Sequence, residues 1–263
     1  MNVNDLLFEF SNKDRYNVLK TLYNESKKHS QLQRELNIPG SEVSRHLKRL
    51  NEKNLIIKNT NNKYIITNIG KIFIRMIDIF EVSLSHKTFL NSHDIISIPV
   101  HLIFQLGKLK DLDFGDKTME NMEIFENLVK DSSKFLYAIT DQYQKSLLKE
   151  AEKKMNEQVI DIKALIDKNL VKTYRVPEEW SQLFKEPDIF YEKLKIFENI
   201  RLLKEIPFSL VVSDKGAILF LNKEGEIDYS QCLIDNHESF INWTKELFEF
   251  YWKKGKPYKR NFL

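Results

Sequence analysis

Apolar residues recur every three or four positions over residues 5–53, a period that predicts three amphipathic helices. The first covers residues 5–22, and we expect a break near Ser11, whose hydroxyl is placed to cap its second part. The second begins at Ser30, which opens a capping-box sequence, and ends near Asn37. The third covers residues 41–53. Short helices in this order predict a compact module with one apolar interior.

The second and third predicted helices are joined by residues 38–40, Ile-Pro-Gly. The proline stops the second helix, and the glycine permits the left-handed backbone of a helix end, so the third helix can leave at a steep angle. The third helix places Val43, Leu47 and Leu50 on one face at i, i+4 and i+7. Two short helices around such a turn are typical of a helix-turn-helix, although ordinary bundles contain them too.

Two short apolar runs follow the third helix. Residues 55–57 and 64–66 have the pattern of β-strands, and segment 58–63 between them is polar and rich in turn-forming residues. The sequence therefore predicts a hairpin, or wing, behind the helix-turn-helix. A helix pair inside an ordinary bundle needs no wing, so the hairpin favours a DNA-binding module.

Residues 41–70 resemble the winged helix-turn-helix of ArsR-like archaeal and bacterial regulators, in which a helix reading S-x-x-S-x-H-L-x-x-L precedes a wing ending in Y-x-(I/L)-T-x-x-G. The matching residues are Ser41, Ser44, His46, Leu47, Leu50, Tyr64, Thr67 and Gly70. The resemblance covers roughly residues 5–75. It implies that the third helix enters the DNA major groove and that the wing touches phosphate or the minor groove. The paired cysteines with which some ArsR proteins bind metal are missing, so metal sensing does not carry over.

The predicted DNA contacts divide according to their place on the third helix and the wing. Base contacts are expected near the N-terminal end of the helix, from Ser41, Ser44 and Arg45, of which Arg45 can contact a guanine edge in bidentate fashion. The residues expected at the phosphates and in the wing are Lys48, Arg49, Lys58, Asn61 and Lys63. His46 has two interpretations, a DNA contact or packing against the second helix, and the sequence leaves both open.

A long apolar helix is predicted after Thr67, a plausible N-cap. Its apolar positions form a face broader than one small winged domain can bury, and they are Ile69, Ile72, Phe73, Met76, Ile77, Phe80 and Leu84. This helix either joins a dimer interface or packs on the next domain. We favour the dimer, because a two-fold protein reads two half-sites about 34 Å apart.

Strand and helix patterns alternate after residue 93. We expect strands over residues 135–139, 159–164, 199–203, 208–212, 217–221 and 227–233, helices over 119–128, 142–155 and 237–252, and an entry segment over 97–109. The β-α-β order of the first strands indicates a parallel sheet. Tight turns at residues 213–216 and 223–226 indicate that antiparallel hairpins join the same sheet.

The final predicted helix places Phe240, Trp243, Leu247 and Tyr251 on one face, which is typical of a helix closing an α/β core. Residues 206–252 resemble the C-terminal domain of archaeal methanogenesis-regulator-type transcription factors, which carry an ArsR-like winged helix ahead of it. The matching residues are Pro207, Val212, Asp214, Gly216, Gly225, Asp228, Trp243, Leu247, Phe248 and Tyr251, with His93, Asp94, Pro99 and Gly107 in the entry segment. The resemblance implies a sensory or regulatory domain whose ligand is generally unassigned.

Charge and cysteine content narrow the class of protein. Residues 1–93 hold 15 Lys and Arg against 9 Asp and Glu, whereas residues 94–263 hold 26 against 29, so the basic excess lies with the predicted DNA-binding module. A single cysteine, Cys232, excludes a disulfide framework and suits a reducing cytoplasm; we expect a small apolar strand residue rather than a redox sensor. No signal-peptide pattern and no run of about 18 apolar residues occurs, so we expect a soluble cytoplasmic protein without membrane contact.

Candidates for catalysis are few. Asp214, Lys215, Asp228, Asp235 and His237 bring carboxylates near a histidine in the sequence, a combination that can serve acid-base chemistry. Three of them, however, lie in or directly after glycine-containing turns, where such residues serve the backbone. No phosphate loop, nucleophile elbow, HExxH or paired CxxC occurs. We expect no enzymatic activity, no cofactor and no metal.

The chain as a whole is predicted to be an α/β (α+β) protein with a winged helix-turn-helix over residues 1–67, a linker or dimerisation helix over 68–93 and a mixed-sheet α/β regulatory domain over 94–263. We interpret it as a sequence-specific transcriptional regulator that binds double-stranded DNA as a homodimer and responds to an unidentified small-molecule or protein effector at its C-terminal domain. The alternative is a protein-interaction adaptor that uses the winged helix without binding DNA, since fold alone does not fix function.

Overall fold

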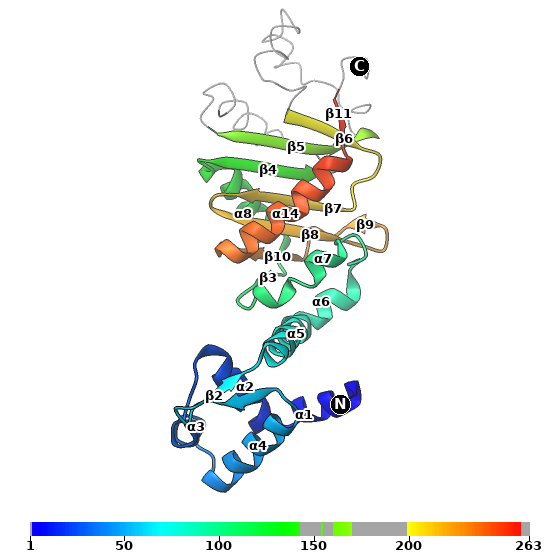
Figure 1. The fold of residues 1–263 in the computed structure, drawn as a ribbon. Helices are drawn as coiled ribbons and strands as arrows, with labels where there is room; N and C mark the ends of the chain where they lie inside the picture. The colour runs from blue at the N-terminus through cyan, green and yellow to red at the C-terminus, as the bar shows by residue number, and fades with distance from the viewer. Residues whose placement is uncertain (1, 143–153, 155–159, 170–198, 259–263) are drawn as a thin grey trace, which may run out of the picture. The chain divides into compact units, whose positions relative to one another are not determined.

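The chain folds into two compact units. The structure, a computed structural model, describes residues 2–142, 154, 160–169 and 199–258. Unit 1 spans Met1–Glu81 and unit 2 spans Val82–Leu263 (Figure 1). Unit 1 is helical with a small hairpin, and unit 2 is built around one large sheet. The predicted fold class, a winged helix-turn-helix followed by a mixed α/β domain, is confirmed.

Unit 1 is a bundle of short helices closed by a hairpin. In chain order its elements are α1 (Val3–Phe10), α2 (Lys13–Asn24), α3 (His29–Leu36), α4 (Gly40–Glu52), β1 (Ile56–Lys58), β2 (Tyr64–Ile66) and the first part of α5 (Asn68–Ser85). Their apolar stripes meet in one core, in which Leu19, Leu32 and Leu50 are fully buried. Because α4 turns its apolar stripe inward, its polar stripe is left in solvent.

The break between the first two helices lies where the sequence predicted it, but the predicted cap is wrong. Asn12, not Ser11, caps α2, because its side chain accepts a hydrogen bond from the Arg15 backbone N–H at 3.0 Å. The Ser11 hydroxyl instead donates to the carbonyl oxygen of Phe8, at the end of α1. Asn and Ser are both good caps, so their order in the sequence did not identify the correct one.

The start of α3 and the turn that follows also differ in detail from the prediction. Ser30 lies inside the helix, which begins one residue earlier, at His29. There the Gln31 side chain accepts a hydrogen bond from the Lys28 backbone N–H at 2.8 Å, so that Lys28 is the N-cap residue. The residue with left-handed backbone is Asn37, at φ 52°, rather than Gly40, which is the first residue of α4. Asparagine tolerates this conformation well enough to end α3 without glycine.

The hairpin has the place predicted for the wing, and its first strand is shifted by one residue. β1 and β2 pair antiparallel. At the tip, the Asn59 side-chain oxygen accepts from the backbone N–H groups of Asn61 and Lys63 at 3.0 and 2.9 Å. Asn62 takes the left-handed conformation at φ 57°. The tip is thus ordered by its own polar residues, which explains its composition.

The junction between the wing and α5 gives a physical reason for two residues of the ArsR-like pattern. Thr67 Oγ1 accepts from the Gly70 N–H at 3.1 Å and donates to the Asn54 carbonyl oxygen at 2.8 Å, so the predicted cap at Thr67 is present. At Gly70 a Cβ atom would lie only 2.4 Å from the Leu55 carbonyl oxygen. The close approach of the two backbones therefore requires glycine at this position.

The long helix α5 ends earlier than predicted. The backbone turns at His86, which precedes a separate short helix, α6 (Lys87–Ser92). Toward the unit 1 core, Ile74 is buried and Phe73 packs edge-on against Phe10 with ring centroids 6.1 Å apart. Four apolar side chains of α5 in unit 1 remain 40–53% exposed, and we call them the α5 stripe: Ile69, Ile72, Met76 and Phe80.

The described residues of unit 2 form a nine-stranded mixed sheet with the order β11-β6-β5-β4-β7-β8-β10-β3, in which β9 pairs with β8. The strands are β3 (Asp113–Gly115), β4 (Phe135–Thr140), β5 (Asp161–Asp167), β6 (Ile200–Leu203), β7 (Phe208–Ser213), β8 (Gly216–Lys223), β9 (Glu226–Ile227), β10 (Cys232–Asp235) and β11 (Lys256–Pro257). β4, β5 and β6 are parallel, and the other pairs are antiparallel. The predicted parallel sheet with added hairpins is confirmed.

Some predicted elements of unit 2 need correction. The single strand expected over residues 227–233 is divided into β9 and β10, because the Asp228 carboxylate accepts from the Ser230 backbone N–H at 2.8 Å and turns the chain. The entry segment forms a short helix, α7 (Val100–Ile103), and a 3-10 turn at Leu106–Lys108. β3 and β11 were not predicted, since two or three residues carry no readable period. Most of the helix expected over 142–155 lies outside the described residues.

Helices cover both faces of the sheet (Figure 1). α8 (Thr118–Asp131) packs on one face, where Phe125 and Leu128 meet Phe220 and its neighbours. α14 (Glu238–Lys254) packs on the other face, where the Tyr251 ring stands perpendicular to that of Phe208 at 5.0 Å. All six residues of β7 are buried, as expected for a strand covered on both sides.

Candidate nucleic-acid interface

The outward face of α4 is polar, cationic and open to solvent. Ser41 and Ser44 are exposed, and the side chains of Arg45 and Lys48 are 64% and 79% exposed. Arg45 pairs with Glu42 on the same helix, and Lys48 Nζ lies 4.0 Å from Glu52. Exposed pairs of this kind contribute about 0.5 kcal/mol or less, so they do not prevent either cation from engaging an anionic ligand.

The N-terminal end of α4 is tied to α3 by His29, which the sequence analysis missed. His29 Nε2 lies 3.0 Å from the Gly40 carbonyl oxygen and 2.9 Å from Ser44 Oγ. This contact fixes the turn and holds the Ser44 hydroxyl near the start of the outward face. His29 and Ser44 lie on different helices, so helical periodicity gave no sign of their contact.

Arg49 differs from its neighbour Lys48, although we predicted the same role for both. Its side chain is 39% exposed, and its Nη2 and Nε atoms donate to the two oxygens of the Glu9 carboxylate at 2.7 and 3.2 Å. Glu9 lies on α1 and is itself almost fully buried, with Arg15 Nε 3.0 Å away. Burial would raise the pKa of Glu9, but the hydrogen bonds from Arg49 and the charge of Arg15 outweigh it and hold the pKa below its usual range.

His46 lies in the core, with 1% of its surface exposed. This burial argues against the first of the two interpretations that the sequence left open, because a buried ring has no access to DNA. Burial, followed by the nearby positive charge of Arg15, lowers the pKa of His46. We therefore leave His46 out of the proposed interface.

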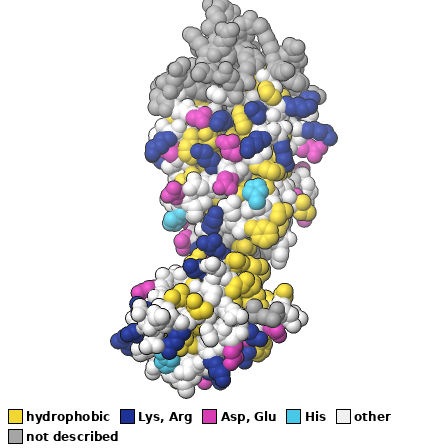
Figure 2. All heavy atoms as spheres, viewed as in Figure 1, with side chains coloured by type: hydrophobic (Ala, Val, Ile, Leu, Met, Phe, Trp, Pro, Cys, Tyr) yellow, Lys and Arg dark blue, Asp and Glu magenta, His cyan; other side chains and the backbone are white. Residues whose placement is uncertain are grey.

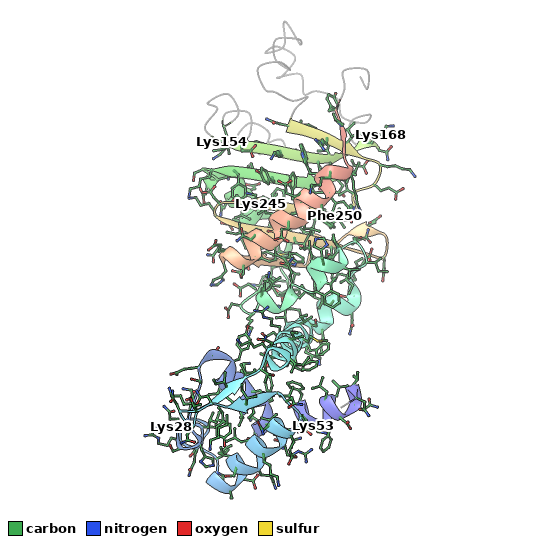
Figure 3. All side chains as sticks on the ribbon, in the orientation of Figure 1. Lys28, Lys53, Lys154, Lys168, Lys245 and Phe250 are labelled. Carbon is green, nitrogen blue, oxygen red and sulfur yellow. The ribbon has the colours of Figure 1, made fainter. Side chains whose placement is uncertain are left out.

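The wing and its surroundings add further cations. Lys58 is exposed, with its Nζ 5.6 Å from the centre of the Tyr64 ring, and Lys63 is half-buried beside the exposed Asn61 at the tip. Figure 3 labels two more cations of unit 1, Lys28 beside α3 and Lys53 directly after α4. The structure thus places the predicted phosphate contacts on exposed or half-exposed sites of unit 1.

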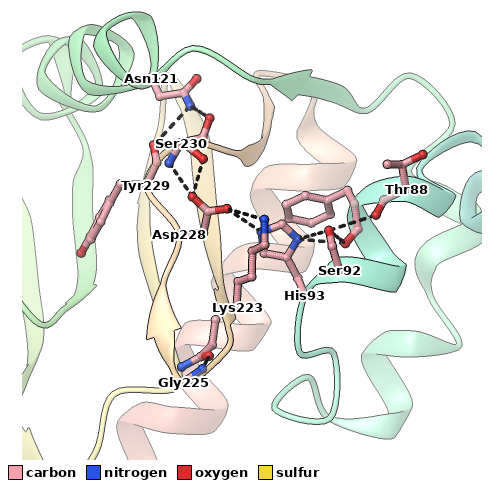
Figure 4. A network of polar contacts seen from close by, with 11 residues as sticks. Thr88, Ser92, His93, Asn121, Lys223, Gly225, Asp228, Tyr229 and Ser230 are labelled. Atoms are coloured by element: carbon pink, nitrogen blue, oxygen red, sulfur yellow. Dashed lines mark hydrogen bonds and ion pairs between the residues drawn. The ribbon is translucent and has the colours of Figure 1, made fainter.

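In unit 2, the polar residues around His93 and Asp228 bond to one another in a network (Figure 4). The His93 side chain is buried, stacks on the Phe89 ring at 4.1 Å and has its Nε2 3.3 Å from the Asp228 carboxylate. Burial would raise the pKa of Asp228, but hydrogen bonds from Ser230 and from His93 lower it. The His93–Asp228 contact joins the end of α6 to the residue directly after β9, which is a structural role for two residues of the second resemblance.

Two further catalytic candidates, Asp214 and Asp235, are bound by backbone N–H groups, and Lys215 pairs with Asp214. Asp214 accepts hydrogen bonds from the N–H groups of Ser133 and Lys134 at 2.8 and 2.9 Å, which ties the β7–β8 turn to the start of β4. Asp235 accepts from the backbone N–H and the ring of His237 at 3.0 and 2.6 Å, at the start of α14. Over the described part of the chain, no group of three or more His, Cys, Asp or Glu residues is arranged to hold a metal ion.

Cys232 is fully buried in β10, and burial raises the pKa of its thiol to about 12. A thiol with this pKa stays protonated at neutral pH and is a poor nucleophile. The structure agrees with the expectation of a small apolar residue in a strand. Among the described residues, none of the helices is long and apolar enough to cross a membrane.

Comparison with known families fits this division into two units. A family model described as "Methanogenesis regulatory protein FilR1, middle domain" matches residues 119–254, just over half of the chain. The chain belongs to the FilR1 middle-domain family. A second model, described as "Bacterial regulatory protein, arsR family", matches residues 12–58, which contain α2, α3, α4 and β1.

The FilR1-family chain is thus a DNA-binding transcriptional regulator rather than an enzyme, since both matching families are regulatory and one of them is a helix-turn-helix family. Both resemblances seen in the sequence are confirmed by these matches. No curated protein matches the chain.

Three solved structures show a distant likeness to this FilR1-family chain. TrmBL2, described as an archaeal chromatin protein with a novel mode of DNA binding, is 13% identical at a TM-score of 0.41, covering 89% of this chain and 88% of its own. Phosphatidylserine synthase of Haemophilus influenzae Rd KW20 is 14% identical at 0.37, covering 54% of this chain and 37% of its own. HmgR of Pseudomonas aeruginosa is 12% identical at 0.27, covering 92% and 96%. At TM-scores this low, these structures add nothing to the family matches.

Proposed function

We propose that α4 of this FilR1-family regulator is a recognition helix that enters the DNA major groove, while the wing contacts the sugar-phosphate backbone. The observation that carries this proposal is the outward face of α4, where Ser44, Arg45 and Lys48 are exposed together on a helix placed by a helix-turn-helix. A protein-interaction adaptor has no need for this combination. The basic balance of residues 1–93 supports the same conclusion.

The roles within the interface follow from position. Ser41, Ser44 and Arg45 lie in the first half of α4, the part of a recognition helix that reaches base edges, so we assign them to base contacts. Lys48, Arg49, Lys58 and Lys63, with Asn61, are assigned to phosphate contacts, which set register and supply salt-dependent affinity.

We further propose that the regulator is a homodimer in which the α5 stripe packs against its copy. The stripe has the spacing i, i+3, i+7, i+11 on a helix whose opposite side packs into unit 1. Hydrophobic side chains lie along this helix on the face shown in Figure 2. An apolar row of this kind is self-complementary about a two-fold axis, and burying it contributes about 25 cal/mol per Å².

Unit 2 is proposed to sense an effector that changes DNA binding. Support comes from a cavity of 730 Å³ at the carboxyl ends of the parallel strands β4 and β5, lined by residues that include Asp141, Asp167 and Asn222. Carboxyl ends of parallel strands are the usual ligand position in α/β folds, and this volume suits a small molecule.

The DNA-binding proposal is tested by selecting bound sequences from a random duplex pool and measuring affinity by fluorescence anisotropy. We expect a palindromic selected site and binding that weakens as salt rises. Arg45→Ala should relax the preference at one base position at a cost of about 1–3 kcal/mol, whereas Lys48→Ala should weaken all sequences alike and lower the salt slope by about one. Failure of the protein to bind any duplex at low salt would favour the adaptor alternative.

The dimer is tested by sedimentation velocity at micromolar concentration. We expect wild type to sediment as a dimer and Met76→Glu to sediment as a monomer, because a buried unpaired carboxylate opposes the interface. Lys71→Glu is the matched control, since it places an acidic residue on the same helix outside the α5 stripe. A monomeric wild type would refute this part of the proposal.

A further inference from the structure

The Arg49 guanidinium is the most constrained cation on the proposed DNA-binding face. Its Nε and Nη2 atoms engage both oxygens of Glu9, and its Cζ lies 5.3 Å from the centre of the Phe8 ring. Both partners come from α1, a helix outside the segment matched by the ArsR model. Within the described part of the chain, Arg49 Nη1 has no hydrogen-bond partner.

The free part of Arg49 lies on the face that the proposed function assigns to DNA. Arg49 is four residues after Arg45 on α4, so the two side chains share one side of the helix. Its side chain keeps 39% of its surface exposed although three of its contacts are made inside unit 1. A guanidinium held through one edge presents its remaining N–H donors in a fixed direction, which an unrestrained side chain does not.

The electrostatics of the cluster keep it attractive to an anion. The Glu9 carboxylate lies between two cations, with Arg15 Nε 3.0 Å away on one side and Arg49 on the other. Three groups therefore carry a net charge of +1; Glu9 and Arg15 are buried, and the exposed member is the cation Arg49. An approaching phosphate meets the exposed Arg49 side rather than the carboxylate.

We propose that Glu9 is a positioning residue for DNA binding. It binds the Nε and Nη2 edge of the Arg49 guanidinium, so that before DNA binds Nη1 points toward solvent as a donor to one backbone phosphate. This inference rests on the proposed function of α4. Ordering a long side chain costs conformational entropy, and here the cost is met in the free protein instead of on binding. Lys48, which is 79% exposed and loosely paired, has no such support.

A double-mutant cycle with a mixed-sequence labelled duplex tests the proposal, because a phosphate contact does not depend on sequence. We expect Arg49→Ala to weaken binding about tenfold and to lower the salt slope by about one. Glu9→Gln alone should weaken binding about fivefold, and the double variant should bind no more weakly than Arg49→Ala alone. Lys48→Ala is the matched control from the same helix. In the Glu9→Gln/Lys48→Ala double variant, the fold losses in DNA affinity of the two single variants should multiply.

Each outcome decides the question. Losses from Glu9→Gln and Arg49→Ala that multiply would mean that Glu9 acts on the fold in general, and tighter binding by Glu9→Gln would mean that its charge only opposes DNA; either result overturns the proposal. Absence of duplex binding by wild type would instead refute the proposed function itself. If Glu9→Gln does not fold, NMR of wild type decides: we expect an Arg49 Nε–H protected from exchange before DNA is added, and exchange as fast as that of Arg45 overturns the proposal.

Discussion

In unit 1, Ser44, Arg45 and Lys48 are exposed on α4, and their partners are weakly bound residues of the same helix or His29. In unit 2, by contrast, the carboxylates of Asp214 and Asp235 are bound to backbone N–H groups. Asp214 illustrates the second case, since it receives hydrogen bonds from three groups across a turn. Both regions contain similar residue types. The comparison teaches that residue type alone does not separate a binding surface from a structural network. What separates them is whether the polar side chains are exposed or already hydrogen-bonded within the fold.

The two units also differ in how their cores are built. The unit 1 core is assembled from one stripe of each short helix, so every helix keeps a polar face for other uses. In unit 2, β7 and most of β8 are buried on both faces between α8 and α14. Changes in the sheet should therefore cost stability, while changes on the outward face of α4 should cost only binding.

The largest effect is expected in the sheet. Phe220 is fully buried and packs against the rings of Phe125 and Tyr229 at 6.5 and 5.0 Å. Phe220→Ala should lower the free energy of unfolding by about 3–5 kcal/mol, because the lost contacts leave a cavity. Urea denaturation followed by circular dichroism measures this loss. Met119→Ala, at a side chain 83% exposed in the same unit, should change stability by less than about 0.5 kcal/mol.

The next effect concerns the junction behind the wing. Gly70→Ala would bring a Cβ within 2.4 Å of the Leu55 carbonyl oxygen and 2.7 Å of Ile66 Cγ1. We expect a loss of about 2–3 kcal/mol, since a backbone atom must shift. In unit 2, Gly225→Ala meets nothing within 4 Å and should cost only about 1 kcal/mol for its positive φ of 97°. Equal losses at both glycines would contradict the steric argument for Gly70.

Much of this arrangement was readable from the sequence because the elements are periodic. The stripe Val43, Leu47 and Leu50 predicted both the buried and the outward face of α4, and turn residues at 213–216 predicted the β7–β8 hairpin. The ion pair of Arg49 with Glu9 could not be predicted from the sequence, because Glu9 lies 40 residues away on another helix. The contact between His29 and Ser44 was missed for the same reason. Contacts between elements, unlike faces of one element, have no fixed spacing in the chain.

A smaller effect separates the units by acid sensitivity. Burial would raise the pKa of Asp214, but backbone hydrogen bonds from Lys134 and Ser133 hold it well below its usual range. A carboxyl with a depressed folded pKa contributes stability above its unfolded pKa of about 3.9, and this stability is lost as the pH falls through the acid range. Asp214→Asn should cost about 1–2 kcal/mol at pH 7 and reduce the acid dependence of the melting temperature. Asp131→Asn, which makes the same change at an exposed carboxylate at the end of α8, is the control.

The smallest effect is expected at His46, where unit 1 should respond to pH in a higher range. Both ring nitrogens are buried and lack a hydrogen-bond partner among the described residues. Because burial and then the charge of Arg15 lower its folded pKa, the unfolded chain takes up a proton first as the pH falls below about 6.5, and stability declines there. His46→Leu removes the unpartnered nitrogens, so at pH 7.5 it should be neutral or stabilising by up to about 1 kcal/mol.

Thermal melts of wild type and His46→Leu between pH 5 and 8 measure the difference, which should widen in favour of the variant at acid pH. The exposed His101, changed to leucine, should leave the wild-type pH dependence unaltered. If His46→Leu kept the full acid loss, the pH response would have to be assigned to another group. If the melting temperature of His46→Leu depended less on pH than that of wild type, the contrast between the units would be sharper. Unit 1 would then lose stability just below neutral pH, and unit 2 would lose it only in strong acid.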